Sequence, residues 1–298
     1  MAEDLLIDTR LLEKLERLTI QWQKSLGGLV GGDNTSRFGG AGQEFLDHRQ
    51  FHHGDELRDV NWRAFMRLEK LFLKVFHLEP RIPVRILFDV SPSMATGAGD
   101  GTLSKFDYAR KLAAAVCYVG LVRLDSITLQ PFSDRLGDGL SVGGGRQRFQ
   151  PAVRYLSALK PGGKTNFLQC ARDFLTKFPQ AGLTIVISDF FDEADCDKPL
   201  QYLADFGHEL ILIHVWADDD REPAWEGELD LEDAESGARL QLPFGEDARV
   251  SYTAAFDEFS AHLREVALRN GGRYVSLSTS NPVEDAIFGP MVRSGALQ

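Results

Sequence analysis

The chain has 298 residues, a length that suits either two domains or one α/β domain with an added layer. Hydrophobic residues make up 43% and charged residues 26%, a balance typical of folded globular chains that excludes bulk disorder. The 33 basic and 44 acidic residues give a net charge of −11, which argues against a dedicated nucleic-acid-binding protein. The longest apolar run, residues 112–122, is shorter than the roughly 18 residues that a membrane span needs.

The amino-terminal sequence and the cysteines indicate the cellular compartment. The acidic start lacks the basic region and the small-residue cleavage site of a secretory signal. Cys117, Cys170 and Cys196 are odd in number and widely separated, which argues against a disulfide framework or a structural zinc site. We therefore predict a cytoplasmic protein with no membrane span and no nucleic-acid partner.

The first 82 residues are predicted to form an N-terminal extension. Apolar residues at helical spacing predict an amphipathic helix over residues 5–26, with Leu11, Leu15, Leu18, Trp22 and Leu26 on one face. This helix either packs on the rest of the chain or binds another protein. The seven glycines of residues 27–42 predict a connector, because no Lys-Ser or Lys-Thr follows as in a phosphate-binding loop. A block rich in charged and aromatic residues occupies 43–63, and the alternation over 71–78 predicts a strand.

From residue 83 onward, short apolar strands alternate with helices. We expect strands at 84–90, 126–132, 140–142, 183–189, 209–216 and 273–277, and helices at 105–122, 149–160, 166–178, near 203–206, at 253–269 and from 283. Residues 226–243 predict a hairpin within an insertion at about 218–250. This order predicts an α/β domain over 83–298, with a mainly parallel sheet and helices on both of its faces.

Two aspartates end apolar strands of this predicted sheet. Asp89 closes the first strand in the pattern Asp89-x-Ser91-x-Ser93, and Asp189 closes the strand at 183–189. Thr165 lies between them at the start of a helix. Ligands of α/β sheets bind beyond the carboxyl ends of the strands, and Mg²⁺ prefers oxygen ligands of these types. We therefore predict a site for Mg²⁺, or for Mn²⁺ or Ca²⁺ in its place, at Asp89, Ser91, Ser93, Thr165 and Asp189.

These residues resemble the metal-ion-dependent adhesion site of the von Willebrand factor A fold. The upstream block resembles the bacterial domain-of-unknown-function 58 (DUF58) family, through the motif Phe51-x-x-Gly54-Asp55-x-x-Arg58-x-x-Asn61-Trp62-Arg63. The later Asp233-x-Glu235-x-Gly237 hairpin is also similar to that family. Tyrosine and proline are more common there at the positions of Phe51 and His53, neither of which is a metal-site position.

The resemblance implies a von Willebrand factor A-like fold and a function without catalysis. The three hydroxyl residues would bind the metal directly, and the two aspartates directly or through water. A protein partner would then donate an acidic side chain to the metal. The family is also commonly linked to AAA+ ATPases of the MoxR type, which implies a role in assembly or a chaperone-like role beside such an ATPase.

Two other functions compete with this one. A Mg²⁺-dependent phosphotransferase or hydrolase would use the same strand-end aspartates, with Asp218, Asp219, Asp220 and Lys164 as further groups. Ser91 stands where an aspartyl phosphatase would have its second acid, which disfavours that function. A histidine metal centre would use His48, His52 and His53 with Asp55, where the spacing of the first two suits one helical face. Ion pairing explains this charged block better.

Overall fold

The computed structural model describes residues 6–21, 44–51, 60–77, 83–97, 102–192, 196–233 and 237–298. The chain forms two compact units, of which the larger contains Met1–Lys24 and Ile82–Gln298 and the smaller contains Ser25–Arg81. The predicted extension over residues 1–82 is therefore divided, because its first 24 residues belong to the larger unit.

A six-stranded sheet in the order β10-β7-β6-β3-β4-β5 forms the centre of the larger unit. The strands are β3 (Pro83–Asp89), β4 (Ser126–Phe132), β5 (Leu140–Val142), β6 (Leu183–Ser188), β7 (Glu209–Trp216) and β10 (Arg273–Ser278). All neighbouring strands run parallel except β5, which is antiparallel to β4. The predicted α/β fold with a mainly parallel sheet is confirmed.

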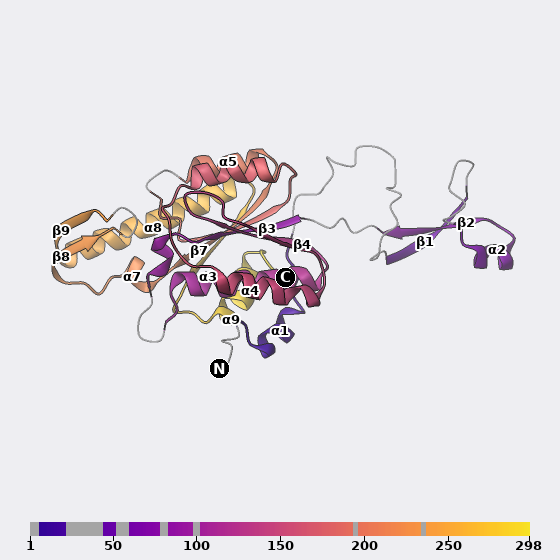
Figure 1. The fold of residues 1–298 in the computed structure, drawn as a ribbon, viewed down its shortest axis with the longest axis horizontal. Coiled ribbons are helices and arrows are strands. Elements are labelled where there is room, and N and C mark those ends of the chain that lie inside the picture. Colours follow the sequence, from indigo (N-terminus) through magenta and orange to yellow (C-terminus); the bar gives the residue numbers. More distant parts are fainter. Residues whose placement is uncertain are drawn as a thin grey trace. The chain divides into compact units, whose positions relative to one another are not determined.

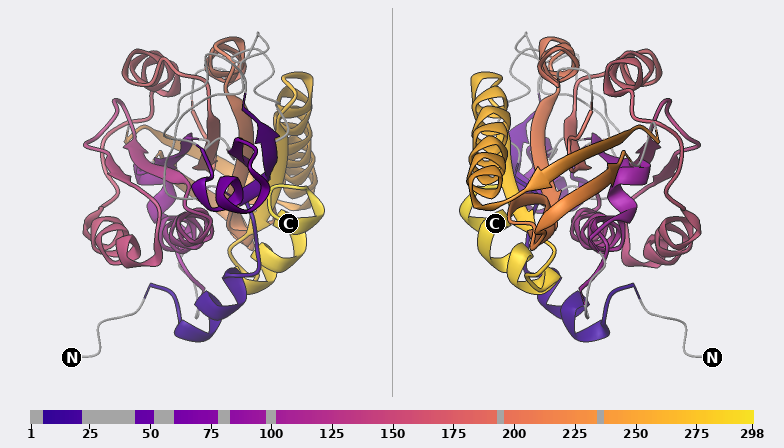
Figure 2. Two further views of the ribbon diagram at one scale, coloured as in Figure 1. Left: turned by 90° about the vertical axis from the view of Figure 1, so that its right-hand side faces the viewer. Right: turned by 90° about the vertical axis from the view of Figure 1, so that its left-hand side faces the viewer.

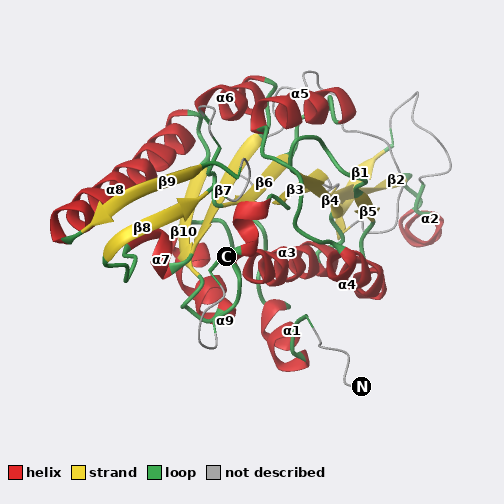
Figure 3. Cartoon of the chain, turned by 60° about the vertical axis from the view of Figure 1, so that its left-hand side comes forward, coloured by secondary structure: helices red, strands yellow, loops and turns green. Residues whose placement is uncertain are grey.

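Helices cover both faces of this sheet, as Figures 1 and 3 show. The longer ones are α3 (Lys105–Val122), α4 (Phe149–Ala158), α5 (Phe167–Lys177), α6 (Asp197–Asp205) and α8 (Glu246–Arg269). In β3, Ile86 and Phe88 belong to the buried cluster that includes α3 and α4, whereas Leu87 belongs to the cluster of α5, α6 and α8. A parallel strand that is buried on both faces needs apolar residues at consecutive positions, which explains the uninterrupted apolar runs of the sequence.

Two features of α3 fix its position beside the sheet. Ser104 caps the helix, since its hydroxyl accepts a hydrogen bond from the Asp107 amide at 3.0 Å. Small residues such as Ala113 and Ala114 are fully buried, so that the helix packs closely on the strands. The three free cysteines, Cys117, Cys170 and Cys196, are also buried.

The amino-terminal helix is shorter than predicted. The helix α1 covers only Thr9–Leu15, so the prediction of a helix over 5–26 is wrong for residues 6–8 and 16–21. Residues 5 and 22–26 lie outside the described ranges. After α1 the chain pairs with residues near position 298, with the Thr19 amide 2.7 Å from the Gln298 carbonyl and the Gln298 amide 2.9 Å from the Thr19 carbonyl. Figure 2 shows α1 in indigo beside the yellow carboxyl-terminal helices, where Lys14 pairs with Glu284. Leu15 is fully buried, so this part of the chain packs on the larger unit.

In the smaller unit, the described residues 44–51 and 60–77 form an antiparallel pair of strands and one helix. These are β1 (Glu44–Gln50), β2 (Phe72–His77) and α2 (Trp62–Leu68). The predicted strand over 71–78 is confirmed by β2. His48 lies on β1, so the helical spacing expected for His48 and His52 is wrong, and His52, His53, Gly54, Asp55 and Arg58 lie outside the described residues.

The remaining elements extend the carboxyl-terminal half of the larger unit. They are α7 (Asp218–Arg221), the hairpin strands β8 (Gly227–Glu232) and β9 (Arg239–Phe244), α9 (Val283–Ala286) and a π-helix at Ile287–Met291. The predicted hairpin is confirmed, and it runs beside the first part of α8 (Figure 3). That helix begins seven residues before the predicted start at 253. None of the helices within the described ranges is long and apolar enough to cross a membrane.

Candidate metal centre

Asp89 and Asp189 lie at the same edge of the sheet, on neighbouring parallel strands. Asp89 is the last residue of β3, and Asp189 directly follows β6. The register pairs Phe88 with Ile187, so that both strands end at the same level. The two aspartates are buried, with exposed fractions of 1% and 0%. Two neighbouring buried carboxyls carry a high desolvation cost and favour the binding of a proton or a cation.

The turn after β3 brings two serine hydroxyls next to Asp89. The Ser91 amide donates a hydrogen bond to Asp89 Oδ1 at 2.8 Å, and the Ser91 and Ser93 hydroxyls lie 2.9 Å apart. A short 3₁₀ turn at Pro92–Ala95 follows, anchored by the fully buried side chain of Met94. Ser91 thus contacts both Asp89 and Ser93, and the three residues lie together after β3.

Ser188 connects the two strand ends. Its hydroxyl donates to Asp89 Oδ2 and accepts a hydrogen bond from the Phe190 amide at 2.8 Å. Phe190 has a φ of 58°, a left-handed conformation that turns the chain sharply after Asp189. The Phe191 amide then donates to Asp189 Oδ1 at 3.2 Å. Both carboxylates are therefore oriented by hydrogen bonds from the backbone of their own turns.

Lys105 supplies the positive charge of this site. The Lys105 ammonium lies 2.8 Å from Asp189 Oδ2 and 3.0 Å from Asp220 Oδ2, and its side chain is only 1% exposed. It also lies over the Phe191 ring, 4.9 Å from the ring centre. Burial lowers the pKa of Lys105, but Asp189 and Asp220 outweigh this effect and leave that pKa above its ordinary value. The lysine is therefore charged.

The pKa of Asp89 is raised to about 7, first because the carboxyl is buried and second because Asp189 lies nearby. Hydrogen bonds from Ser188 and Ser91 oppose this shift but do not cancel it. The folded protein thus holds a proton on Asp89 at pH values at which an aspartate in an unfolded chain, with a pKa of about 3.9, is ionised.

Thr165 lies in the loop before α5, half-buried, next to the helix cap Asn166. Two backbone hydrogen bonds hold this loop at the same sheet edge. The Gly162 amide donates to the Val90 carbonyl at 2.7 Å, and the Asn166 amide donates to the Ser133 carbonyl at 3.0 Å. Thr165 is therefore placed near the strand ends by its loop.

The donor set fits a hard divalent cation. Carboxylate and hydroxyl oxygens are ligands that Mg²⁺, Mn²⁺ and Ca²⁺ accept. In the described part of the chain no group of three or more His, Cys, Asp or Glu side chains is arranged to hold a metal ion. A metal at Asp89 would consequently depend on the serine and threonine hydroxyls for part of its ligand shell.

Lys105, Ser188 and Asp220 contribute to this site although the sequence did not identify their roles. The sequence alone contains one indication that Lys105 has a special role. Lys105 lies in the first turn of a predicted helix, where the helix dipole disfavours a cation. The acids at 218–220, named above as further groups for the enzymatic alternative, have three different surroundings. Asp218 accepts hydrogen bonds from Ser278 and Ser280, Asp220 pairs with Lys105, and Asp219 is exposed.

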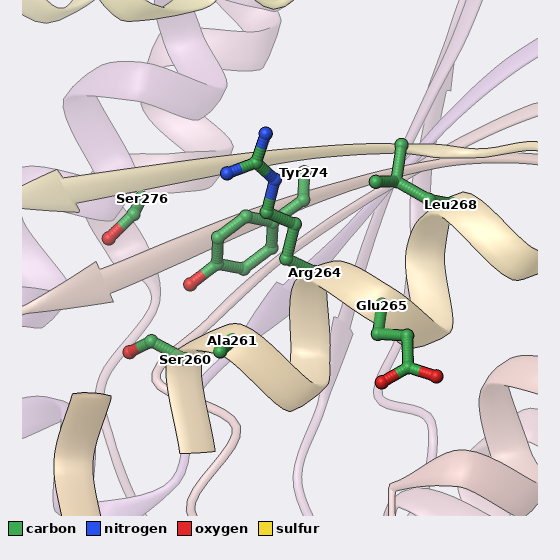
Figure 4. A pocket seen from close by; sticks show the side chains of 7 residues that line it. All are labelled: Ser260, Ala261, Arg264, Glu265, Leu268, Tyr274 and Ser276. Carbon is green, nitrogen blue, oxygen red and sulfur yellow. The ribbon is translucent and has the colours of Figure 1, made fainter. Parts of the chain in front are cut away.

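A separate pocket of about 390 Å³ lies between α8 and β10 (Figure 4). Arg264 and Leu268 of α8 and Tyr274 of β10 are among its lining residues. The Tyr274 hydroxyl lies 2.8 Å from Nδ1 of the buried His214, and burial lowers the pKa of this histidine to about 3. The neutral His214 is thus a core residue of the sheet. No residue of the metal centre lines this pocket.

Comparisons with known proteins identify the family. An uncharacterized protein of Mycobacterium tuberculosis (strain H37Rv) is 25% identical over 272 residues, which cover 87% of this chain and 81% of that protein. The crystal structure of the conserved hypothetical protein BatB from Bacteroides thetaiotaomicron matches with a TM-score of 0.42 and 20% identity, over 72% of this chain and 98% of that one. An aerotolerance-related membrane protein from Bacteroides fragilis matches with a TM-score of 0.41 and 18% identity, over 71% and 99% of the two chains. The family model described as protein of unknown function DUF58 matches residues 47–262, and the chain therefore belongs to the DUF58 family.

Proposed function

We propose that this protein is a non-enzymatic, metal-dependent protein-interaction module. The observation that carries the proposal is the pair of buried carboxyls, Asp89 and Asp189, beside the contacting hydroxyls of Ser91 and Ser93. These four residues and Thr165 would hold Mg²⁺, or Mn²⁺ or Ca²⁺ in its place. Bound there, the metal would supply a Lewis-acidic position for a carboxylate from a protein partner.

The residues of the site support binding better than catalysis. Asp89 accepts hydrogen bonds from Ser91 and Ser188, so both of its oxygens are already fixed. Ser91 occupies the position at which a phosphatase would need its second acid, and Lys164 is exposed in its loop. The partner that we propose is a MoxR-type AAA+ ATPase, which the family resemblance supports. The joint role would be assembly or chaperone-like activity in the cytoplasm.

The first test is magnesium binding to the full chain after treatment with chelator. Isothermal titration should detect binding in the wild type, and Asp89→Asn and Ser91→Ala should each weaken it by about 100-fold, since substitutions even outside the ligand shell cost about 10–100-fold. Asp219→Asn is the matched control, because Asp219 is an exposed acid near the site. Circular dichroism checks that each variant is folded. Equal affinity in all four proteins, or no binding in the wild type, would refute the metal site.

The second test is partner binding. A purified MoxR-type ATPase from the same organism should bind the wild type in Mg²⁺, and lose binding both in chelator and with Asp89→Asn. Binding that survives both treatments would assign the partner to another surface. Hydrolysis of phosphate esters by the purified protein, lost in Asp89→Asn, would instead establish the enzymatic alternative.

A further inference from the structure

We propose that Lys105 is a resident counter-ion of the metal centre, which competes with the divalent cation for Asp189 and thereby weakens metal binding. This inference rests on the proposed function, because it concerns the same site. The structural basis is the contact of the Lys105 ammonium with one oxygen of Asp189, at 2.8 Å, in the interior of the protein.

The fold of α3 does not explain a lysine at this position. Lysine is almost never fully buried unless it is paired, and a cation in the first turn of a helix is disfavoured by the helix dipole. The neighbouring Phe106, Tyr108 and Ala109 are buried, so an apolar side chain would suit this end of the helix. Buried ion pairs can often be replaced by apolar residues without loss of stability. The position of Lys105 therefore points to the acids that it contacts.

The charges around Lys105 indicate its effect. The Lys105 ammonium contacts Asp189 and Asp220, and Asp89 lies next to Asp189 at the same edge of the sheet. A divalent cation bound at Asp89 and Asp189 would therefore lie close to a positive charge that repels it. Without Lys105 the same acids would attract the cation without this repulsion. Lys105 thus lowers the attraction of the site for the metal.

Asp220 gives the lysine a second partner. Its Oδ2 lies 3.0 Å from the Lys105 ammonium and also accepts a hydrogen bond from the Ala217 amide at 2.8 Å. This second contact fixes the carboxylate at the start of α7, which follows β7. Lys105 can therefore remain paired with Asp220 when Asp189 contributes to the metal. Removing the charge of Asp220 would leave Lys105 with Asp189 alone and strengthen the competition.

The experiment measures Mg²⁺ affinity and thermal stability of the full chain in two variants with opposite expected effects. Lys105→Met should tighten Mg²⁺ binding by about tenfold or more, which is about 1.4 kcal/mol and the low end of coupling between close charges. The Lys105→Met variant should also melt at a lower temperature than the wild type in chelator, and at the wild-type temperature in excess Mg²⁺. Asp220→Asn should weaken Mg²⁺ binding severalfold. The matched controls are Lys111→Met, on the second turn of α3, and Asp219→Asn, and both should bind as the wild type does.

The outcomes separate this inference from the proposed function. Magnesium binding that is unchanged or weakened in Lys105→Met overturns the role of Lys105 and leaves the metal site intact. A lysine with only a structural role would lower the melting temperature both with and without Mg²⁺ and would not tighten binding. If Lys105→Met does not fold, the inference is decided by Asp220→Asn, and affinity equal to that of Asp219→Asn overturns it. Absence of binding in the wild type refutes both proposals.

Discussion

Removal of Arg273 should destabilise the larger unit more than any change to an exposed ion pair. Arg273 is the first residue of β10 and is only 5% exposed. Its guanidinium donates to the buried Glu209 carboxylate at the start of β7 and to the backbone carbonyls of Gln21 and Gly295. The Arg273 side chain therefore links four parts of the larger unit, which are β10, β7, the segment after α1 and the segment around residue 295.

The cost in free energy of unfolding follows from the contacts that each substitution removes. Glu209→Gln leaves a buried guanidinium that keeps its two carbonyl acceptors, and breaking a buried pair in this way costs about 3–5 kcal/mol. Arg273→Met leaves a buried carboxylate and also removes two hydrogen bonds, which adds about 1 kcal/mol for each. We expect Arg273→Met to be the more destabilising by about 1–2 kcal/mol. The double variant should be more stable than Arg273→Met alone, because residue 209 is then neutral and no buried carboxylate has lost the Arg273 guanidinium.

Urea unfolding followed by circular dichroism measures these differences in the free energy of unfolding. In a thermal melt, the melting temperature should fall by about 2–4 °C for each kcal/mol lost. The control is Arg269→Met, which breaks an exposed pair with Glu265 on α8 and should change stability little. A loss below about 1 kcal/mol for Arg273→Met would refute this reasoning. A double variant that is less stable than Arg273→Met would also refute it, since the loss of the guanidinium from the buried Glu209 carboxylate would then not be the cause.

Two further predictions concern the site and the amino-terminal segment. The raised pKa of Asp89 means that the folded state binds more protons than the unfolded state between about pH 4 and pH 7, so metal-free stability should fall as pH rises through this window. Urea unfolding in chelator at pH 5 and pH 7.5 should show a smaller fall in Asp89→Asn, and an equal fall in both proteins would contradict the assignment. Leu15→Ala should cost about 2–5 kcal/mol because Leu15 is fully buried. The half-buried Leu12→Ala should cost less in the same assay, and equal small losses would show that α1 does not pack on the larger unit.

The sequence was sufficient to predict the α/β part of the fold because its signals are local. Apolar runs such as 183–188 have the length and composition of buried strands, and the Ser104 cap marks the start of α3. The carboxyl ends of parallel strands meet at one edge by geometry, so the proximity of Asp89 and Asp189 followed from the strand assignment alone.

Other features depend on contacts that no local pattern contains. The helical spacing of the leucines predicts that Leu15 and Leu18 are buried, and both are, as is Ile20. The chain nevertheless leaves the helix after Leu15 and pairs with Leu297 and Gln298. The role of Lys105 depends on Asp189, which lies 84 residues later in the chain, and on Asp220 beyond it. The strand β1 was not predicted because its charged residues do not alternate with apolar ones.

The pairing of Thr19 and Ile20 with residues at the far end of the chain has a consequence for synthesis in the cell. Thr19 and its partner Gln298 are 298 − 19 = 279 residues apart in the sequence, so these contacts form only after almost the entire described chain has left the ribosome. Closing so long a loop is entropically costly and slow compared with forming a helix such as α3. Until residue 298 has emerged, the apolar side chains of residues 15–20 lack part of their packing partners. Part of this apolar segment therefore stays exposed on the nascent chain until residues 297 and 298 have emerged, and such transiently exposed surface is what chaperones protect.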